Sequence, residues 1–301
     1  FLNTIFLTAF KDKDIKKDVI LLDQVRNGDK MPIFLEQEDW SAFATAAGNC
    51  SYNQCDISDD WSDYTFKVGK LNCEVTICFE SFATDFNRFF RTYWKGDESD
   101  LANAVVQFLA ERMQSKQLKA EMRVYFFGDS SVTANGLINA TDGIFVQAEA
   151  QVTTNPDLRV TVTENAGATA AAQTITDGQV LYNYYALAYN IASNLPWFEV
   201  DKMVYYIDRQ NANTLVGWLN AQADLKGISC DCLDPEKVTK ARVFTADNIS
   251  IYGIPVKVYD FQAMMKGAGS PYYDSATGLF DAKNRFILAR EENLMLGYEL
   301  D

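Results

Sequence analysis

Residues 128–130, Gly-Asp-Ser, follow an aromatic run and have the residue types with which one group of serine hydrolases presents its nucleophile. A serine nucleophile needs a neighbouring base that takes its proton, and that base is normally a histidine. The 301-residue chain contains no histidine, and no Ser-x-x-Lys pattern follows Ser130 to supply a lysine base instead. We therefore predict that Ser130 lies in a turn after a long helix. A serine hydrolase that uses Ser130 stays as the alternative from another functional class.

Thiol and carboxylate groups are the other candidates for chemistry. The six cysteines are Cys50, Cys55, Cys73, Cys78, Cys230 and Cys232. Cys73 and Cys78 are an odd number of residues apart on an expected strand, so their side chains point to opposite faces. We expect free thiols in a reducing compartment, with a thiolate metal site or disulfides as alternatives. The acidic run 56–63 lacks the glycine and final glutamate of an EF-hand, so a solvated loop is favoured over calcium. We predict no catalytic residue, no cofactor and no metal.

The net charge is −14, from 41 acidic and 27 basic residues. This balance argues against a protein that coats nucleic acid, because such binding requires clustered Lys and Arg. No run reaches the ~18 apolar residues of a membrane span. The first residue is Phe1 rather than Met, and proteolytic processing of the natural chain is one explanation that we keep.

An extended ribbon is predicted from residue 30 to residue 79. Residues 70–80 alternate between polar and apolar, which predicts a strand. Phe66 and Val68 lie on the opposite parity, and the slip at Gly69 indicates a β-bulge. The segment is therefore expected to form two long strands joined by a wide loop that projects from the body. Such a ribbon is marginally stable alone and needs a neighbour to lie on.

The rest of the chain predicts a mixture of helices and strands. The amphipathic segment from about Ser99 to Met122 predicts one long helix, with Asp97 or Ser99 as its N-cap. Further along we expect a strand at 158–164, a helix at 180–195 that Pro196 ends, a buried strand at 202–208, a helix through 215–225, a strand kinked at Gly-Ile-Pro within 249–261, and two closing strands within 284–301. The tyrosines at 182, 184, 185 and 189 are typical of a helix buried on most sides, with a stacking platform as the alternative. The fold class is α+β.

The order of these elements resembles the Hong Kong 97-type fold, the fold of the major capsid protein of tailed bacteriophages. The stretch FKVGKLNCEVTICFESF is similar to the returning strand of that family's extended loop. The stretch LANAVVQFLAERMQSKQLKAEMRVYFFGDSSVTANGLINATDGI looks like its spine helix and the turn that follows. DKMVYYIDRQNANTLVGWLNA, ISIYGIPVKVYDFQAM and NRFILAREENLMLGYELD are similar to its axial-domain and closing segments. The frequent tyrosines and asparagines are reminiscent of crAss-like gut phages.

The resemblance implies a division of the chain into an N-terminal arm (1–29), an extended loop or β-ribbon (30–79), a peripheral domain with the spine helix (80–143 and 276–301) and an axial domain (144–275). It implies a structural protein, not an enzyme, that self-assembles as a homo-oligomer of hexamers and pentamers into an icosahedral shell. The shell would be assembled in the host cytoplasm, contact portal or decoration proteins, and enclose double-stranded DNA in the virion without sequence-specific binding. Trp40, Phe43 and Trp61 of the ribbon are then candidate intersubunit contacts. An encapsulin-like bacterial compartment shell, which shares the fold, is the nearest alternative.

Overall fold

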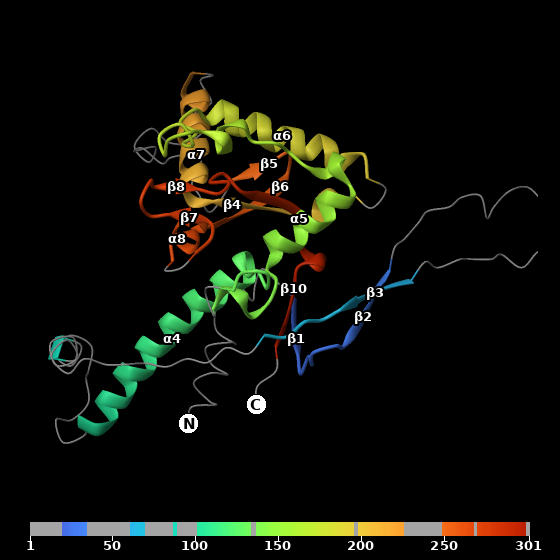
Figure 1. Cartoon of the computed structure of the whole chain (residues 1–301). Helices are drawn as coiled ribbons and strands as arrows, with labels where there is room; N and C mark the ends of the chain where they lie inside the picture. The colour runs from blue at the N-terminus through green and yellow to red at the C-terminus, as the bar shows by residue number, and fades with distance from the viewer. Residues whose placement is uncertain are drawn as a thin grey trace, which may run out of the picture.

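The computed structural model describes residues 20–34, 61–69, 87–88, 101–133, 137–195, 198–225, 249–267 and 270–298. These residues form helices and strands that are mixed along the chain, so the α+β class is confirmed (Figure 1). In the described part of the chain, no helix combines the length and apolar character that crossing a membrane requires.

A four-stranded mixed sheet lies at the centre of the fold, with its strands in the order β5-β6-β4-β9. The strands are β4 (Met203–Asp208), β5 (Ser250–Ile251), β6 (Ile254–Tyr259) and β9 (Phe286–Arg290). Strand β4 runs parallel to β6 and antiparallel to β9. All six residues of β4 are buried, because layers of side chains cover both faces of the sheet. A strand buried on both faces has a nearly continuous run of apolar residues, whereas a strand buried on one face alternates apolar and polar residues.

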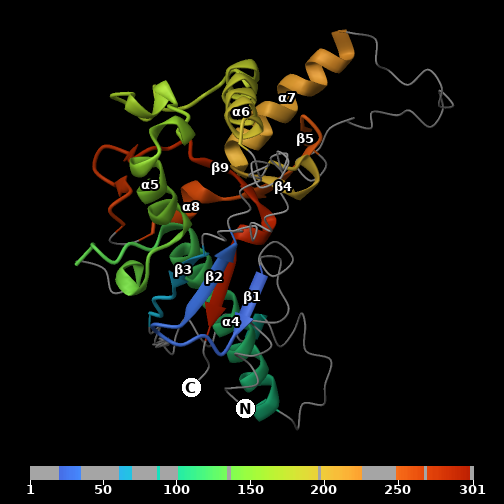
Figure 2. The same cartoon turned by 90° about the vertical axis from the view of Figure 1, so that its right-hand side faces the viewer.

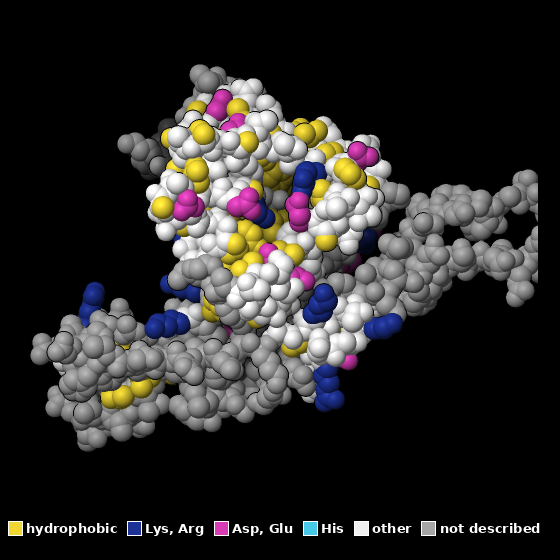
Figure 3. All heavy atoms as spheres, in the orientation of Figure 1, with side chains coloured by type: hydrophobic (Ala, Val, Ile, Leu, Met, Phe, Trp, Pro, Cys, Tyr) yellow, Lys and Arg dark blue, Asp and Glu magenta, His cyan; other side chains and the backbone are white. Residues whose placement is uncertain are grey.

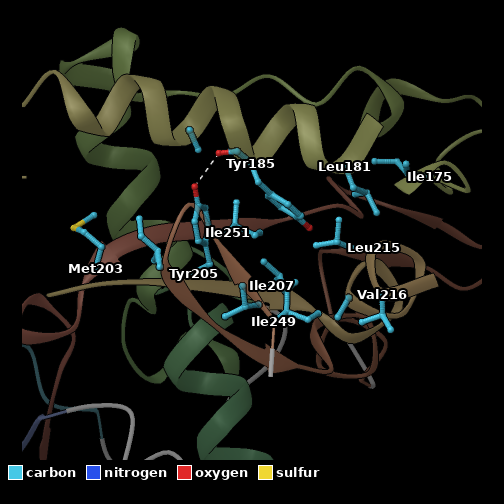
Figure 4. Packing of buried hydrophobic residues seen from close by; sticks show 14 of the residues in the cluster. Ile175, Leu181, Tyr185, Met203, Tyr205, Ile207, Leu215, Val216, Ile249 and Ile251 are labelled. Carbon is cyan, nitrogen blue, oxygen red and sulfur yellow. Dashed lines mark hydrogen bonds between the residues drawn. The ribbon is translucent and has the colours of Figure 1, made fainter. Parts of the chain in front are cut away.

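Helices α6 (Gly178–Ser193) and α7 (Arg209–Leu225) cover one face of this sheet. Figure 4 shows the packing, in which Tyr185 of α6 and Leu215 of α7 lie against the strand residues Tyr205 and Ile207. The Tyr205 hydroxyl donates a hydrogen bond of 2.8 Å to the backbone carbonyl of Tyr185. This face is therefore held by apolar burial together with one buried hydrogen bond between helix and strand.

An aromatic cluster covers the opposite face of the sheet. It joins Tyr206 of β4 to the end of α4 (Leu101–Phe127), to α5 (Ile144–Thr154) and to α8 (Phe261–Met265). Phe127 is fully buried and stacks on Phe145 with the ring centroids 5.0 Å apart. Because the last turn of α4 lies in this core, the helix is fixed at one end and extends away from the sheet (Figures 1 and 2).

Three smaller strand pairs complete the described part. Strand β1 (Ile20–Asp23) runs parallel to β10 (Met295–Tyr298), whereas β2 (Lys30–Phe34) pairs antiparallel with β3 (Trp61–Thr65). Strands β7 (Tyr273–Asp274) and β8 (Leu279–Phe280) form a short hairpin. The short 3-10 helices are η3 (Ile138–Ala140), η4 (Pro156–Leu158), η5 (Thr163–Ala166), η6 (Val200–Lys202) and η7 (Glu291–Asn293). In Figure 3, hydrophobic side chains are visible in the hollow at the middle of the lobe that carries the sheet.

The helices predicted at about 99–122, 180–195 and 215–225 are confirmed as α4, α6 and α7. Helix α4 continues to Phe127, beyond the predicted end, because its last residues enter the aromatic core. Its predicted N-caps, Asp97 and Ser99, lie outside the described residues. The buried strand at 202–208 and the two closing strands are also confirmed, as β4, β9 and β10.

Two strand predictions were wrong in detail. Residues 158–164 alternate in burial, with Val162 buried between exposed neighbours, but they form 3-10 turns and irregular chain rather than a strand. Residues 249–261 are not one kinked strand but the β5–β6 hairpin followed by α8. In the hairpin, Tyr252 and Gly253 both have positive φ values, 53° and 82°. A type I′ turn, one of the two common two-residue connections between antiparallel strands, requires this combination.

Candidate functional site: the ribbon junction

The paired strands β2 and β3 leave the body of the protein at a point where three chain segments meet. These segments are residues 66–69, 128–130 and 138–143, and we call their meeting point the ribbon junction. In Figure 1 the ribbon extends to one side of the body and α4 to the other. The junction therefore connects the base of the ribbon to the end of the long helix.

The ribbon enters the junction with its two strands held in register. Lys30 lies opposite Thr65, and Phe34 lies opposite Trp61. Two backbone hydrogen bonds continue the pairing past the strand ends, from the Phe66 amide to the Asp29 carbonyl and from the Gly28 amide to the Phe66 carbonyl, each 2.9 Å long. The strands therefore begin from a fixed base.

Residues 67–69 are anchored to the segment that follows η3. The Thr141 hydroxyl donates a hydrogen bond of 2.9 Å to the Lys67 carbonyl. The Lys67 ammonium lies 3.9 Å from the Asp142 carboxylate, but this lysine side chain is 76% exposed, so solvent screens the ion pair and it adds little stability. The neutral hydrogen bond is the more secure of these two contacts.

Glycines allow the close approach of backbones at the junction. A Cβ atom on Gly69 would lie 2.1 Å from the Ala140 carbonyl oxygen, and one on Gly128 would lie 2.2 Å from the Thr141 carbonyl oxygen. Residue 128 also joins α4 to the same segment, since its amide donates to the Val124 carbonyl and its carbonyl accepts from the Gly143 amide, both at 2.8 Å. Strand β3 ends at Thr65, before the predicted β-bulge at Gly69, and the glycine is needed where the chain passes Ala140 of η3. The strand predicted at 70–80, on the other side of that bulge, lies outside the described residues.

Asp142 is the charged residue at the centre of the junction. Its carboxylate accepts a hydrogen bond of 2.8 Å from the Ser130 backbone amide. Burial alone would raise the pKa of Asp142, but the hydrogen bonds from the side chain and backbone of Ser130, together with the positive charge of Lys67, outweigh burial and lower that pKa. The carboxylate is therefore ionised at neutral pH and ties the turn after α4 to the base of the ribbon.

The Gly-Asp-Ser stretch forms the turn that we predicted after a long helix. Asp129 closes this turn by accepting hydrogen bonds from the amide and hydroxyl of Ser131, at 2.9 and 2.5 Å. Its other carboxylate oxygen lies 3.5 Å from the Tyr272 hydroxyl. Ser130 itself is exposed, and its carboxylate neighbour Asp142 has a lowered pKa, which makes it a weak general base. The hydrogen bonds of Asp129 with Ser131 and of Asp142 with Ser130 suit a structural turn.

Of the three candidate intersubunit residues, the structure describes only Trp61. Trp40 and Phe43 lie outside the described residues, and Trp61 is the first residue of β3, at the end of the paired segment away from the junction. All six cysteines and most of the acidic run 56–63 are also outside the described residues. The structure therefore places Trp61 on the ribbon and describes none of the thiols.

Sequence reasoning missed Thr141 and Asp142 as anchors of the ribbon. Lys67 and Thr141 are 74 residues apart, and no local pattern connects positions at such a distance. The available signal was the pair of glycines at 128 and 143, which flank the turn after the helix.

In comparisons with known proteins, the sequence matches none of the protein-family models and none of the curated proteins.

Proposed function

We propose that this protein is a shell subunit with the Hong Kong 97-type fold, the major capsid protein of a tailed bacteriophage. In this proposal it assembles through hexamers and pentamers into an icosahedral shell around double-stranded DNA, and the ribbon β2–β3 is a strap that lies across a neighbouring subunit. Its place of action is the virion, after assembly in the host cytoplasm.

The ribbon junction is the observation that carries the proposal. A two-stranded ribbon that projects from a protein is marginally stable alone, yet this one begins from backbone hydrogen bonds, a side-chain hydrogen bond and two close glycine contacts. The same junction connects it to the last turn of a 27-residue helix that is fixed in the aromatic core. A strap that bears load between subunits needs such an anchor to a rigid element.

The proposal assigns the strands of the central sheet to two domains. In the proposed division of the chain, the β5-β6-β4 part of the sheet with α6 and α7 belongs to the axial domain (144–275). The antiparallel strand β9 comes from the second peripheral segment, 276–301. The long helix and the ribbon then lie on the other side of the aromatic core, in the peripheral domain and the extended loop.

Replacement of residues 42–58 by a short Gly-Ser turn tests the proposal. We expect a variant with normal circular dichroism and a cooperative melt, because its own core lies in the sheet lobe. We also expect the loss of closed particles in sedimentation and negative-stain electron microscopy, whereas the unaltered chain forms shells. Normal shells from the shortened protein would refute the strap, and failure to fold would place the ribbon in the subunit's own core.

Point variants locate the contact more finely. Trp40→Ala and Phe43→Ala are expected to reduce assembly, since removal of a buried aromatic anchor from an interface costs about 2 kcal/mol or more. Leu158→Ala is the matched control, because Leu158 is an exposed apolar residue (37%) on the sheet lobe and should leave assembly unchanged. Nuclease-protected double-stranded DNA in particles from the native source distinguishes a phage capsid from an encapsulin-like compartment, which would contain protein cargo.

A further inference from the structure

Lys283, between β8 and β9, is a buried lysine with an incomplete set of partners. The residue is 6% exposed, and its ammonium group donates a hydrogen bond of 2.6 Å to the Thr174 hydroxyl. That hydroxyl in turn donates to the Ala170 carbonyl at 2.9 Å, so its oxygen is free to act as the acceptor. A lysine ammonium has three N–H donors, and the described residues supply an acceptor for one of them.

A second lysine lies over the same aromatic ring as the first. The ammonium groups of Lys266 and Lys283 are 5.5 and 5.7 Å from the centre of the Phe280 ring, and Lys266 also lies 5.7 Å from the centre of the Tyr273 ring. The Lys266 residue is exposed to solvent. Burial lowers the pKa of Lys283, and the neighbouring charge of Lys266 lowers it further.

Neither lysine has a carboxylate within 4.0 Å among the described residues, although the chain has an excess of acidic groups. Other lysines do form such pairs: Lys202 with Glu199 at 2.9 Å and Lys257 with Glu291 at 2.8 Å. The negative charge that acts on Lys283 comes from Asp208. That carboxylate already accepts hydrogen bonds from Gln210 and Gln262.

A buried ammonium group without an anion in direct contact is costly, and proteins place such groups beside an opposite charge. We propose that Lys266 and Lys283 bind a small oxyanion of the phosphate class beside the Phe280 ring. The oxygens of such an anion accept the N–H groups that Lys283 leaves unused, while Lys266 adds a second positive charge from the solvent side. The burial of Lys283 and the aromatic rings of Phe280 and Tyr273 restrict the ligand to a small one. The bound anion would hold the loop after β8 against Thr174, before α6.

Thermal unfolding in phosphate and in chloride, at equal ionic strength and pH 7.5, tests this site. For the unaltered chain we expect the melting temperature to rise with the logarithm of the phosphate concentration above the dissociation constant, by about 5 °C at a hundredfold excess over that constant. The Lys283→Met variant should lose this increase and keep only the smaller, general effect of phosphate on protein stability. The control Lys202→Met removes an exposed lysine and should keep the full phosphate effect.

Two further measurements keep the test decisive. Phosphate stabilises many proteins without a site, but that general effect would persist in Lys283→Met, and its persistence at full size would overturn the proposal. If Lys283→Met does not fold, Lys266→Ala, at an exposed position, should weaken phosphate binding in calorimetry by about tenfold. The absence of saturable binding to the unaltered chain would equally refute the site. The test uses the folded subunit, so its outcome is independent of shell assembly.

Discussion

Gly69→Ala is the substitution that tests the ribbon junction most directly. The new Cβ atom would lie 2.1 Å from the carbonyl oxygen and 2.5 Å from the carbonyl carbon of Ala140. Both are backbone atoms, so a rotamer change cannot relieve the clash. Residues 66–69 must instead move away from η3, which breaks the hydrogen bond between the Thr141 hydroxyl and the Lys67 carbonyl.

The expected cost combines two effects. Overpacking in a well-packed site costs about 1–3 kcal/mol, and loss of an intramolecular hydrogen bond costs about 1 kcal/mol. Residues 67–69 lie at least partly at the surface, so the chain can shift and relieve much of the strain. We therefore expect the free energy of unfolding to fall by about 2 kcal/mol and shell assembly to fall much further, because the displaced ribbon no longer starts in the correct direction.

Urea unfolding followed by circular dichroism measures the first effect, and sedimentation of assembled particles measures the second. Gly217→Ala is the matched control, since nothing lies within 4 Å of a Cβ atom at this position in α7. This control should stabilise the protein by up to about 1 kcal/mol, the usual gain for Gly→Ala inside a helix, and should assemble normally. Normal stability and normal assembly of Gly69→Ala would show that the junction does not fix the ribbon.

Three further predictions concern individual contacts. The lowered pKa of Asp142 means that the ionised carboxylate stabilises the fold above pH about 4 and that this stabilisation is lost as the pH falls through the folded-state pKa. Asp142→Asn should therefore lower the free energy of unfolding by about 1 kcal/mol at pH 7 and by little at pH 2. An equal cost at both pH values in urea titrations would contradict this. Tyr185→Phe should stabilise the protein or leave it unchanged, because no hydrogen-bond partner for the buried Tyr185 hydroxyl lies among the described residues. Tyr205→Phe should cost about 1 kcal/mol by loss of a buried hydrogen bond. The reverse order in thermal melts would refute the assignment. Ser130→Ala should change local turn stability alone, and loss of a reproducible esterase activity in this variant would instead support the hydrolase alternative.

Sequence patterns predicted best those elements in which the spacing of apolar residues follows directly from which faces of the element are buried. Strand β4 is apolar throughout because both of its faces are covered, and α6 and α7 have the helical spacing of apolar residues that the sheet requires. Residues 158–164 show the limit of this reasoning. Val162 is buried and its neighbours are exposed, so the alternation is real, but a strand also needs a hydrogen-bonding partner, and a sequence pattern does not show whether one exists.

The junction was harder to predict because its contacts join segments far apart in the chain. The β2–β3 pairing, the Thr141–Lys67 hydrogen bond and the approach of Gly69 to Ala140 each connect positions separated by at least 27 residues. Polar residues in such contacts look like ordinary surface residues in the sequence. Gly69, at which the alternation of apolar residues changes parity, was a further local signal, and it fits a close backbone approach as well as a bulge.

The β5–β6 turn shows how a tertiary contact can replace the usual turn chemistry. Tyr252 adopts a φ of 53°, which is unfavourable for a bulky residue by about 1–2 kcal/mol. Its ring stacks on Tyr189 with the centroids 4.5 Å apart and on Tyr182 with the centroids 5.9 Å apart. Tyr182 and Tyr189 are seven residues apart on α6, about 10 Å along a helix, which leaves room for one ring between them. Each stacked pair contributes about 0.5–1.5 kcal/mol, enough in total to offset the strained backbone. The tyrosine spacing on α6, which we interpreted as the mark of a buried helix, is therefore also what makes a Tyr-Gly turn possible between β5 and β6.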